Sequence, residues 1–341
     1  MTRSLWFSAA CALLLASTIV ASLWVGAAPI ESDAVFRALW ERVGFEAAGS
    51  PPWVDTVLFR IRLPRAVCAA LVGGALAVTG CALQGLFRNP LADPGVLGVS
   101  SGAALAAVTC IYLGLAARFA WALPVAAFIG ALVTGFGVYR IASVRGQTPL
   151  ATLLLAGIAA STIAQAALAL VLFLALEEFD VGRQIVFWSL GGVEGRGWSH
   201  AALIAPSTLL GAAVLVYHAR DLDAMSLGET QAASVGVDVS ALRTRVIAAS
   251  AVLVGGAVSI AGVIGFVGLL IPHALRLVIG PRHRLLLIAS LVIGAAFLVS
   301  GDLLARSVWA PKEMRLGIVT AALGGPFFLA LLLAKKREGL L

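Results

Sequence analysis

Apolar residues fill this chain in long runs, most of them about twenty residues long, separated by short stretches that hold charges and prolines. A run of that length is long enough to cross the hydrocarbon core of a bilayer as a helix. The runs lack the alternation of apolar and polar positions that marks the strands of a membrane barrel. Only helices and closed barrels satisfy their backbone hydrogen bonds in lipid, so the pattern predicts an all-α polytopic membrane protein.

The bounded runs predict ten transmembrane helices per subunit. Their approximate ranges are 5–27, 64–86, 93–114, 119–140, 150–175, 198–218, 241–261, 263–280, 284–307 and 315–334. The first run is longer than the core of a usual signal peptide, so we expect it to be a span. Basic residues at 335–337, at 140 and 145, and at 282 and 284 fall on one side and predict that both termini are cytoplasmic.

The segment 220–245 is the most sustained polar stretch of the chain, and the topology puts it in the cytoplasm. Ser226 and Glu229 have the spacing of a capping box, and Gly236 is a natural stop, so we expect a short helix between them. A solvated loop is the alternative interpretation.

Two predicted extracytoplasmic segments have the pattern of helices lying on the membrane surface. Residues 29–63 place apolar side chains at helical spacing, namely Phe36, Leu39, Trp40, Val43 and Phe45. Residues 177–197 contain a second such segment, in which we expect Trp188, like the nearby Trp198, to anchor at the membrane interface.

An internal repeat is visible in the sequence. A shift of 182 residues (253 minus 71) places Leu71–Ala75 on the identical Leu253–Ala257, and it also aligns Gly80 with Gly262 and Pro90 with Pro272. The two copies have opposite directions in the expected topology, which predicts an inverted repeat with half-units of about 64–175 and 241–334 in one permease domain, 1–341. Convergent packing of small residues is the alternative.

Composition agrees with a membrane protein and restricts its chemistry. The 341 residues are 61% hydrophobic and 12% charged, with a mean hydropathy of +1.02. The net charge of +7 comes from residues at the ends of apolar runs, so it does not indicate nucleic-acid binding. All four cysteines lie inside apolar runs, without the spacing of a metal site, and we expect them to be small buried side chains: Cys11, Cys68, Cys81 and Cys110.

The chain has no recognisable source of energy for transport. It contains no GxxxxGK[ST] phosphate loop and only three lysines. No ionisable residue lies near the middle of a span, as an ion-coupled carrier would need; Asp302 and Arg306 come nearest, at a helix end where they can pair. We expect a separate motor protein to bind segment 220–245. An ion-coupled secondary transporter and an intramembrane enzyme stay open as alternatives.

Several long motifs resemble the permease subunit of binding-protein-dependent ABC importers for iron-siderophores, haem and cobalamin (FecCD-type, type II importers). They are Arg62–Arg65, Gln84–Gly98, Leu153–Gly157, Gly262–Arg276, Leu316–Thr320 and Gly324–Phe327. The resemblance covers nearly the whole chain. It implies a multi-pass, ten-helix protein of the bacterial inner membrane that forms a homodimer, with two ATP-binding subunits in the cytoplasm and a periplasmic substrate-binding protein. The chain would be no enzyme, with no catalytic or metal-binding residue and no cofactor; ATP and Mg would bind the partner ATPase.

The resemblance also implies site residues. The coupling element that seats in the ATPase, at about 220–240, would comprise Asp223, Ser226, Leu227, Gly228, Glu229, Ala233 and Gly236. The residues that match the arginines which pair with glutamates of the binding protein are Arg62, Arg65 and Arg306. Arginine suits this role because its planar fork holds a carboxylate in two hydrogen bonds. Snorkelling of these side chains to lipid headgroups is the alternative.

Residues Asn89, Pro90 and Leu91 resemble the family's cytoplasmic gate at the inner end of the second helix. Proline ends a helix and frees carbonyl groups that need a wet or protein-lined setting, although a structural turn would do the same. The overall pattern is most similar to the haem-import branch, so haem or a related iron chelate is the expected substrate, with ferric siderophore or cobalamin as the alternative. No pair of axial haem ligands can be identified, and we read His273 as structural.

Overall fold

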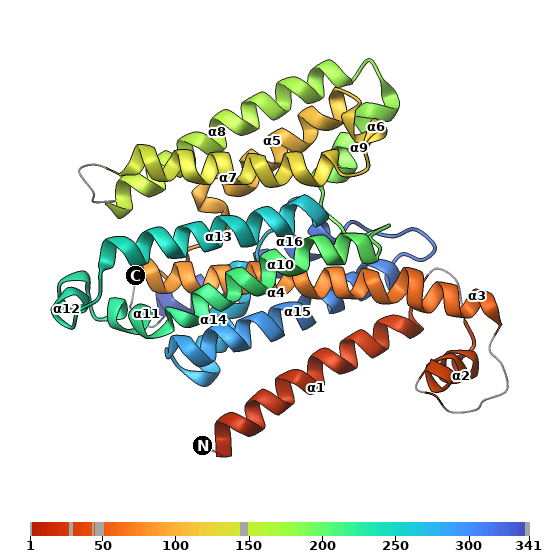
Figure 1. The fold of residues 1–341 in the computed structure, drawn as a ribbon, viewed down its shortest axis with the longest axis horizontal. Helices are drawn as coiled ribbons and strands as arrows, with labels where there is room; N and C mark the ends of the chain where they lie inside the picture. Colours follow the sequence, from red (N-terminus) through yellow and green to blue (C-terminus); the bar gives the residue numbers. More distant parts are fainter. Residues whose placement is uncertain (1, 27–29, 43, 45–50, 144–148, 338–341) are drawn as a thin grey trace.

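The computed structural model describes residues 2–26, 30–42, 44, 51–143 and 149–337, and they form helices and connecting turns (Figure 1). The N-terminal elements are α1 (Thr2–Trp24), α2 (Ser32–Arg42), α3 (Pro52–Asp55), η1 (Thr56–Arg62), α4 (Leu63–Leu86), η2 (Pro94–Leu97), α5 (Val99–Tyr112), α6 (Leu115–Arg118) and α7 (Ala122–Ala142). The later elements are α8 (Leu150–Ala175), α9 (Phe179–Ser189), α10 (Trp198–Tyr217), α11 (Ala219–Ser226), α12 (Glu229–Ser234), α13 (Val239–Ala261), α14 (Val267–Ile279), α15 (His283–Ser307) and α16 (Leu316–Arg337). The predicted all-α class is confirmed.

Six helical stretches of the described chain are long and apolar enough to cross a membrane. They are Pro52–Leu86, Ala122–Ala142, Ala151–Ala175, Trp198–Tyr217, Val239–Ala261 and His283–Ser307. Four shorter apolar helices, Ala9–Trp24, Val99–Tyr112, Val267–Ile279 and Leu316–Ala330, coincide with the other four expected spans. The protein is therefore polytopic, while the number of ten spans stays a prediction.

Helix α4 runs through the centre of the bundle, where α10, α13, α14 and α15 pack around it (Figure 1). Two glycine contacts allow this close packing. A methyl group on Gly73 would overlap the carbonyl oxygen of Gly294 in α15, and one on Gly80 would overlap that of Gly268 in α14. Small residues let helix backbones approach in lipid, where no hydrophobic force presses helices together, so these glycines define the core.

Helices α5, α7 and α8 form a separate layer that packs on α13 (Figure 1). Helix α8 is apolar throughout, yet it exposes large side chains such as Leu155, Ile158 and Ile163. A helix with this much exposed apolar surface requires an apolar environment, either lipid or another subunit.

The two ends of the bundle carry different elements. The start of α1, the end of α16, and helices α11 and α12 lie at one end, and α2, α3, α6 and α9 lie at the other (Figure 1). Helices α4 and α13, which hold the two copies of the sequence repeat, lie side by side and run in opposite directions. This arrangement suits an inverted repeat, although the repeat and its half-units stay predictions.

Both expected surface segments contain helices, α2 and α9. Val43 and Phe45 of the first segment lie outside the described residues. The interpretation of Trp188 as an interface anchor is wrong, because its side chain is 8% exposed and belongs to the core, whereas Trp198 is 49% exposed. The four cysteines are buried and form no disulfide, as expected.

Candidate functional site

The polar segment, defined here as residues 219–238, consists of two short helices between α10 and α13. Its first helix, α11, is amphipathic and buries Leu222 and Met225 completely against α4 and α15. Gly228 then turns the chain at a φ of 126°, a conformation that a residue with a Cβ rarely adopts, and α12 begins. The expected short helix is confirmed as α12.

The expected capping box is wrong in its residues. Gly228, and not Ser226, is the N-cap of α12, and the Ser226 hydroxyl donates back to the carbonyl oxygen of Asp223 at 2.6 Å. The hydroxyl therefore belongs to the preceding helix. The stop at Gly236 is confirmed, because this residue has a φ of 89° and comes right after Val235, the C-cap of α12.

Two large apolar side chains are exposed where the polar segment turns. Leu227 is 73% exposed and Val235 is 72% exposed, although both lie among polar residues. Ser226, Ala233 and Gly236 are also exposed, whereas Gly228 is buried. An exposed apolar pair on an otherwise polar element marks a surface suited to contact with another protein.

The two acids expected to face the motor protein are bound inside the subunit. Asp223 Oδ1 accepts hydrogen bonds at 2.8 Å from the backbone N–H and from ring Nδ1 of His283, the first residue of α15. Glu229 forms an ion pair with Arg243 of α13 at 2.6 Å. These contacts fasten the polar segment to α15 and α13. The coupling role of its residues stays a prediction.

The three residues of the expected gate follow the end of α4 at Leu86. Asn89 Oδ1 accepts the Leu91 N–H at 2.9 Å, and the Asn89 N–H donates to the Gln84 carbonyl oxygen at 3.2 Å. Asn89 and Leu91 are exposed. Helix α4 therefore ends before Pro90, and the Asn89 side chain stabilises the turn that follows it. A gating role for these residues stays a prediction.

A cluster of charged side chains lies at the opposite end of the bundle; we call Arg62, Arg65, Asp302, Arg306 and Glu313 the arginine cluster. Arg65 donates from Nε and Nη2 to Asp302, at 2.8–3.1 Å, and from Nη1 to Glu313 at 2.9 Å. Arg306 Nε lies 3.1 Å from Asp302 Oδ2, so the suspected internal pairing is present. The three arginines and Asp302 are at most 8% exposed.

Two arginines of this cluster bind the end of α1. Arg62 Nη1 donates to the carbonyl oxygens of Leu23 and Trp24, and Arg306 Nη1 donates to those of Ser22 and Val25. The last carbonyls of a helix have no partner within the helix and carry its negative dipole end, so cations stabilise them. The arginine cluster therefore ties α1 to α4 and α15.

The sequence analysis predicted these arginines as docking residues but did not identify most of the groups that they contact in the structure. Asp302 was recognisable because it lies four residues before Arg306, on the same helix face. Glu313 and the α1 carbonyls have no such local signal. The structure places the three guanidinium groups together, as the docking hypothesis requires, but it buries them, and docking itself stays a prediction.

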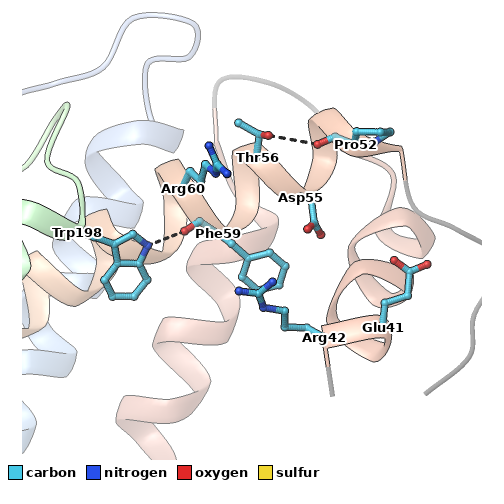
Figure 2. Close-up of a pocket in the computed structure, with 8 residues that line it drawn as sticks. All are labelled: Glu41, Arg42, Pro52, Asp55, Thr56, Phe59, Arg60 and Trp198. Atoms are coloured by element: carbon cyan, nitrogen blue, oxygen red, sulfur yellow. Dashed lines mark hydrogen bonds between the residues drawn. The ribbon is translucent and has the colours of Figure 1, made fainter. Parts of the chain in front are cut away.

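A polar pocket of about 540 Å³ lies beside this cluster, between α2, the α3–η1 helix and α10 (Figure 2). Trp198 Nε1 donates to the Phe59 carbonyl oxygen at 2.8 Å, and the Arg42 guanidinium lies 5.0 Å from the centre of the Phe59 ring. Glu41 and Asp55 face the same space. Apart from Trp198, sequence reasoning singled out none of these residues, because the charged ones lie on two separate segments, α2 and the α3–η1 helix.

The comparisons with known proteins cover nearly the whole chain. The model of the FecCD transport family matches residues 13–334. The cobalamin import system permease protein BtuC of Halobacterium salinarum is 44% identical over 284 residues, which are 83% of this chain and 75% of that protein. The hemin transport system permease protein HmuU of Yersinia pestis is 41% identical over 313 residues, 89% of each chain.

One solved structure has the same fold. It is described as an inward-facing conformation of a metal-chelate type ABC transporter, and it matches with a TM-score of 0.82 and 30% sequence identity. The match covers 96% of this chain and 99% of that one.

Proposed function

This chain belongs to the FecCD transport family of importer permeases, and we propose that it carries haem, or a related iron chelate, inward across the bacterial inner membrane. It would do so as a homodimer, with two ATP-binding subunits at the polar segment and a periplasmic binding protein at the arginine cluster. Ferric siderophore and cobalamin are the alternative substrates within the same family.

The observation that carries the proposal is the exposed apolar pair on the polar segment. Leu227 and Val235 are each more than 70% exposed, while Asp223 and Glu229 fasten the segment to α15 and α13. A partner would bury apolar surface on an element that is already rigidly attached to two long helices. A push on this element would therefore move helices, which is what a motor subunit must achieve.

The opposite end suits a partner that delivers substrate. The continuous helix Pro52–Leu86 has 35 residues and is about 50 Å long, whereas the hydrocarbon core is about 30 Å thick. Its first turns, with the polar pocket of Figure 2, would then project beyond the membrane. Docking by a binding protein's carboxylates would require Arg62, Arg65 and Arg306 to exchange their present partners.

Haem is supported by the family resemblance and by the hemin permease relative, while the cobalamin permease relative supports the alternative. Three of the four histidines, His218, His273 and His283, are buried and so are poorly placed to bind iron during passage. A passage without strong ligands would allow the substrate to leave as well as enter.

The test is reconstitution of the chain with its ATP-binding subunit and binding protein in proteoliposomes. We expect haem uptake that needs both ATP and the binding protein and that exceeds the uptake of a ferric siderophore or of cyanocobalamin. Preferential uptake of another substrate would correct the cargo only. Uptake under an ion gradient without ATP would replace the proposal with an ion-coupled carrier.

The docking residues need a separate test. Reversing the charge of Arg62 and Arg65 should abolish stimulation of ATP hydrolysis by the binding protein. Complex assembly and basal hydrolysis are measured alongside, because both arginines also hold contacts within the subunit. Unchanged stimulation in a correctly assembled complex would show that the binding protein docks elsewhere.

A further inference from the structure

His283 lies where three elements meet, at the same end of the bundle as the polar segment. It is the first residue of α15, its side chain is 1% exposed, and it contacts both α11 and the last turn of α4. A fully buried histidine with two such neighbours needs a reason, because burying a polar ring costs free energy unless its contacts compensate.

The contact with α11 is made through Asp223. One oxygen, Oδ1, accepts both the backbone N–H of His283 and its ring Nδ1, each at 2.8 Å. Because a carboxylate oxygen is the acceptor, Nδ1 is the donor, and the two bonds together fix the ring's orientation. The carboxylate also lies at the N-terminus of α15, where the helix dipole favours negative charge. Asp223 therefore caps α15 from another helix.

The contact with α4 is made by the opposite edge of the ring. A methyl group on Gly85 would overlap Nε2 of His283, so the ring occupies the space of a side chain that α4 lacks. In the described part of the chain Nε2 has no hydrogen-bond partner. Gly85 lies in the last turn of α4, four residues before Asn89 and its neighbour Pro90. The ring therefore presses on the helix end from which the expected gate continues.

We propose that His283 is a positioning residue that transmits movement of the polar segment to the end of α4 and its gate residues. This rests on the proposed function, in which a motor subunit moves the polar segment. Displacement of α11 pulls or pushes Asp223, the two hydrogen bonds carry the ring with it, and the ring bears directly on Gly85. The same carboxylate moves the start of α15, so both helices respond together.

Apolar packing is the other route by which α11 could move its neighbours. Leu222 and Met225 of α11 are completely buried, and α11 packs against both α4 and α15. The two routes differ in what they require. Only the histidine route needs the Asp223 hydrogen bond and the close fit at Gly85, so substitutions at these two positions separate them.

The experiment measures gate movement without assuming a substrate. Leu91→Cys introduces a thiol at an exposed position, whereas the four native cysteines are all at most 5% exposed. In the complete complex with the ATP-binding subunit, we measure the rate of maleimide labelling with and without ATP and vanadate. A shift of the gate from one conformer in ten to nine in ten would change the labelling rate about tenfold.

Two substitutions break the two contacts separately in this reporter background. His283→Leu keeps much of the side chain's volume but removes the ring donor to Asp223, while the backbone N–H donor remains. His283→Asn keeps a donor near the Nδ1 position but leaves the space at Gly85 empty. Each should reduce the ATP-dependent change in labelling to less than about twofold while ATP hydrolysis continues. Gly85→Ala alone should have a similar effect, because its methyl group overlaps the ring.

Combining His283→Asn with Gly85→Ala should restore the response, since the methyl group then fills the vacated space. If His283 only stabilised the fold, complex assembly and ATP hydrolysis would fall in the single variants and recover in the double variant together with the labelling response. The inference expects assembly and hydrolysis to stay unchanged while the labelling response alone is lost and restored. His200→Asn, at the far end of the bundle, is the matched control and should keep the full response.

The results separate the inference from the proposed function. The inference is wrong if ATP changes the labelling rate of the introduced thiol equally in the Leu91→Cys protein and in the His283 variants made in that background. It is also wrong if those variants lose complex assembly and ATP hydrolysis in parallel with the labelling response. If the Leu91→Cys protein without further substitutions shows no ATP-dependent change in labelling, that result would contradict both the coupling in the proposed function and the expected gate at Asn89, Pro90 and Leu91.

Discussion

The arginine cluster buries four charged side chains, whereas the polar segment at the other end of the bundle exposes two large apolar ones. At the arginine cluster, Asp302 is shared by Arg65 and Arg306, and carbonyl oxygens at the end of α1 accept hydrogen bonds from Arg62 and Arg306. At the polar segment, the acids are held internally while Leu227 and Val235 face outward. The difference teaches that charge alone does not mark a contact surface; what matters is whether the group is already satisfied inside the subunit.

The largest expected effect is at the arginine cluster. Arg65→Ala leaves Asp302 buried beside Arg306 alone and also frees Glu313. Breaking a buried ion pair from one side typically costs about 3–5 kcal/mol. We expect the free energy of unfolding in detergent to fall by about that amount.

The control removes both charges together. Arg65→Met combined with Asp302→Leu should recover part of the lost stability, because no buried carboxylate then lacks Arg65. Arg306 keeps its hydrogen bonds to the α1 carbonyl oxygens but loses its ion pair with Asp302, so the recovery is incomplete. A single Arg65→Ala variant as stable as the wild type would mean that the cluster is solvated, and the contrast with the polar segment would disappear.

The next effect is at the polar segment. Leu227→Asp should leave the free energy of unfolding nearly unchanged, since the side chain is 73% exposed. It should weaken binding of the ATP-binding subunit about tenfold or more, which corresponds to about 1.4 kcal/mol. Titration of the purified subunits measures this affinity. Thr230→Ala, exposed on the same segment, is the control, and equal binding by both variants would place the contact elsewhere.

The smallest effect concerns Glu229. In its ion pair with Arg243 the Glu229 side chain is 48% exposed, and pairs with such access to water contribute about 0–1 kcal/mol to stability. Glu229→Arg should nevertheless uncouple ATP hydrolysis from uptake if the carboxylate binds the motor subunit. Glu229→Arg combined with Arg243→Glu restores the internal pair with reversed charges. Coupling that returns in this double variant would show that Glu229 acts only within the subunit.

Much of the fold was predictable because lipid imposes a simple rule. The positions of the apolar helices follow from run length, and the surface helices α2 and α9 follow from the spacing of their apolar residues. Two predictions were wrong, one because of the local helix boundary and one because of contacts between residues far apart in the sequence. Ser226 could have capped α12, but it is the last residue of α11, and Gly228 occupies the N-cap position of α12. Trp188 resembled an interface residue because its burial depends on helices that are remote in sequence.

The candidate sites show the same division. The sequence identified the polar segment and the three arginines as the chemically unusual parts of an apolar chain. It could not show that Asp223 reaches His283, 60 residues later, or that Arg62 reaches the carbonyls of Leu23 and Trp24, because hydrogen bonds between distant segments leave no local pattern.

By itself, then, the sequence determined a helical membrane protein, the approximate positions of its apolar helices, and the family whose motifs it carries. Only the tertiary structure decided which charged side chains are paired within the subunit and which surfaces are exposed to a partner. The physical reason is that the composition of a segment controls whether it can lie in lipid, whereas the state of each polar group depends on the neighbours that packing brings within hydrogen-bond distance.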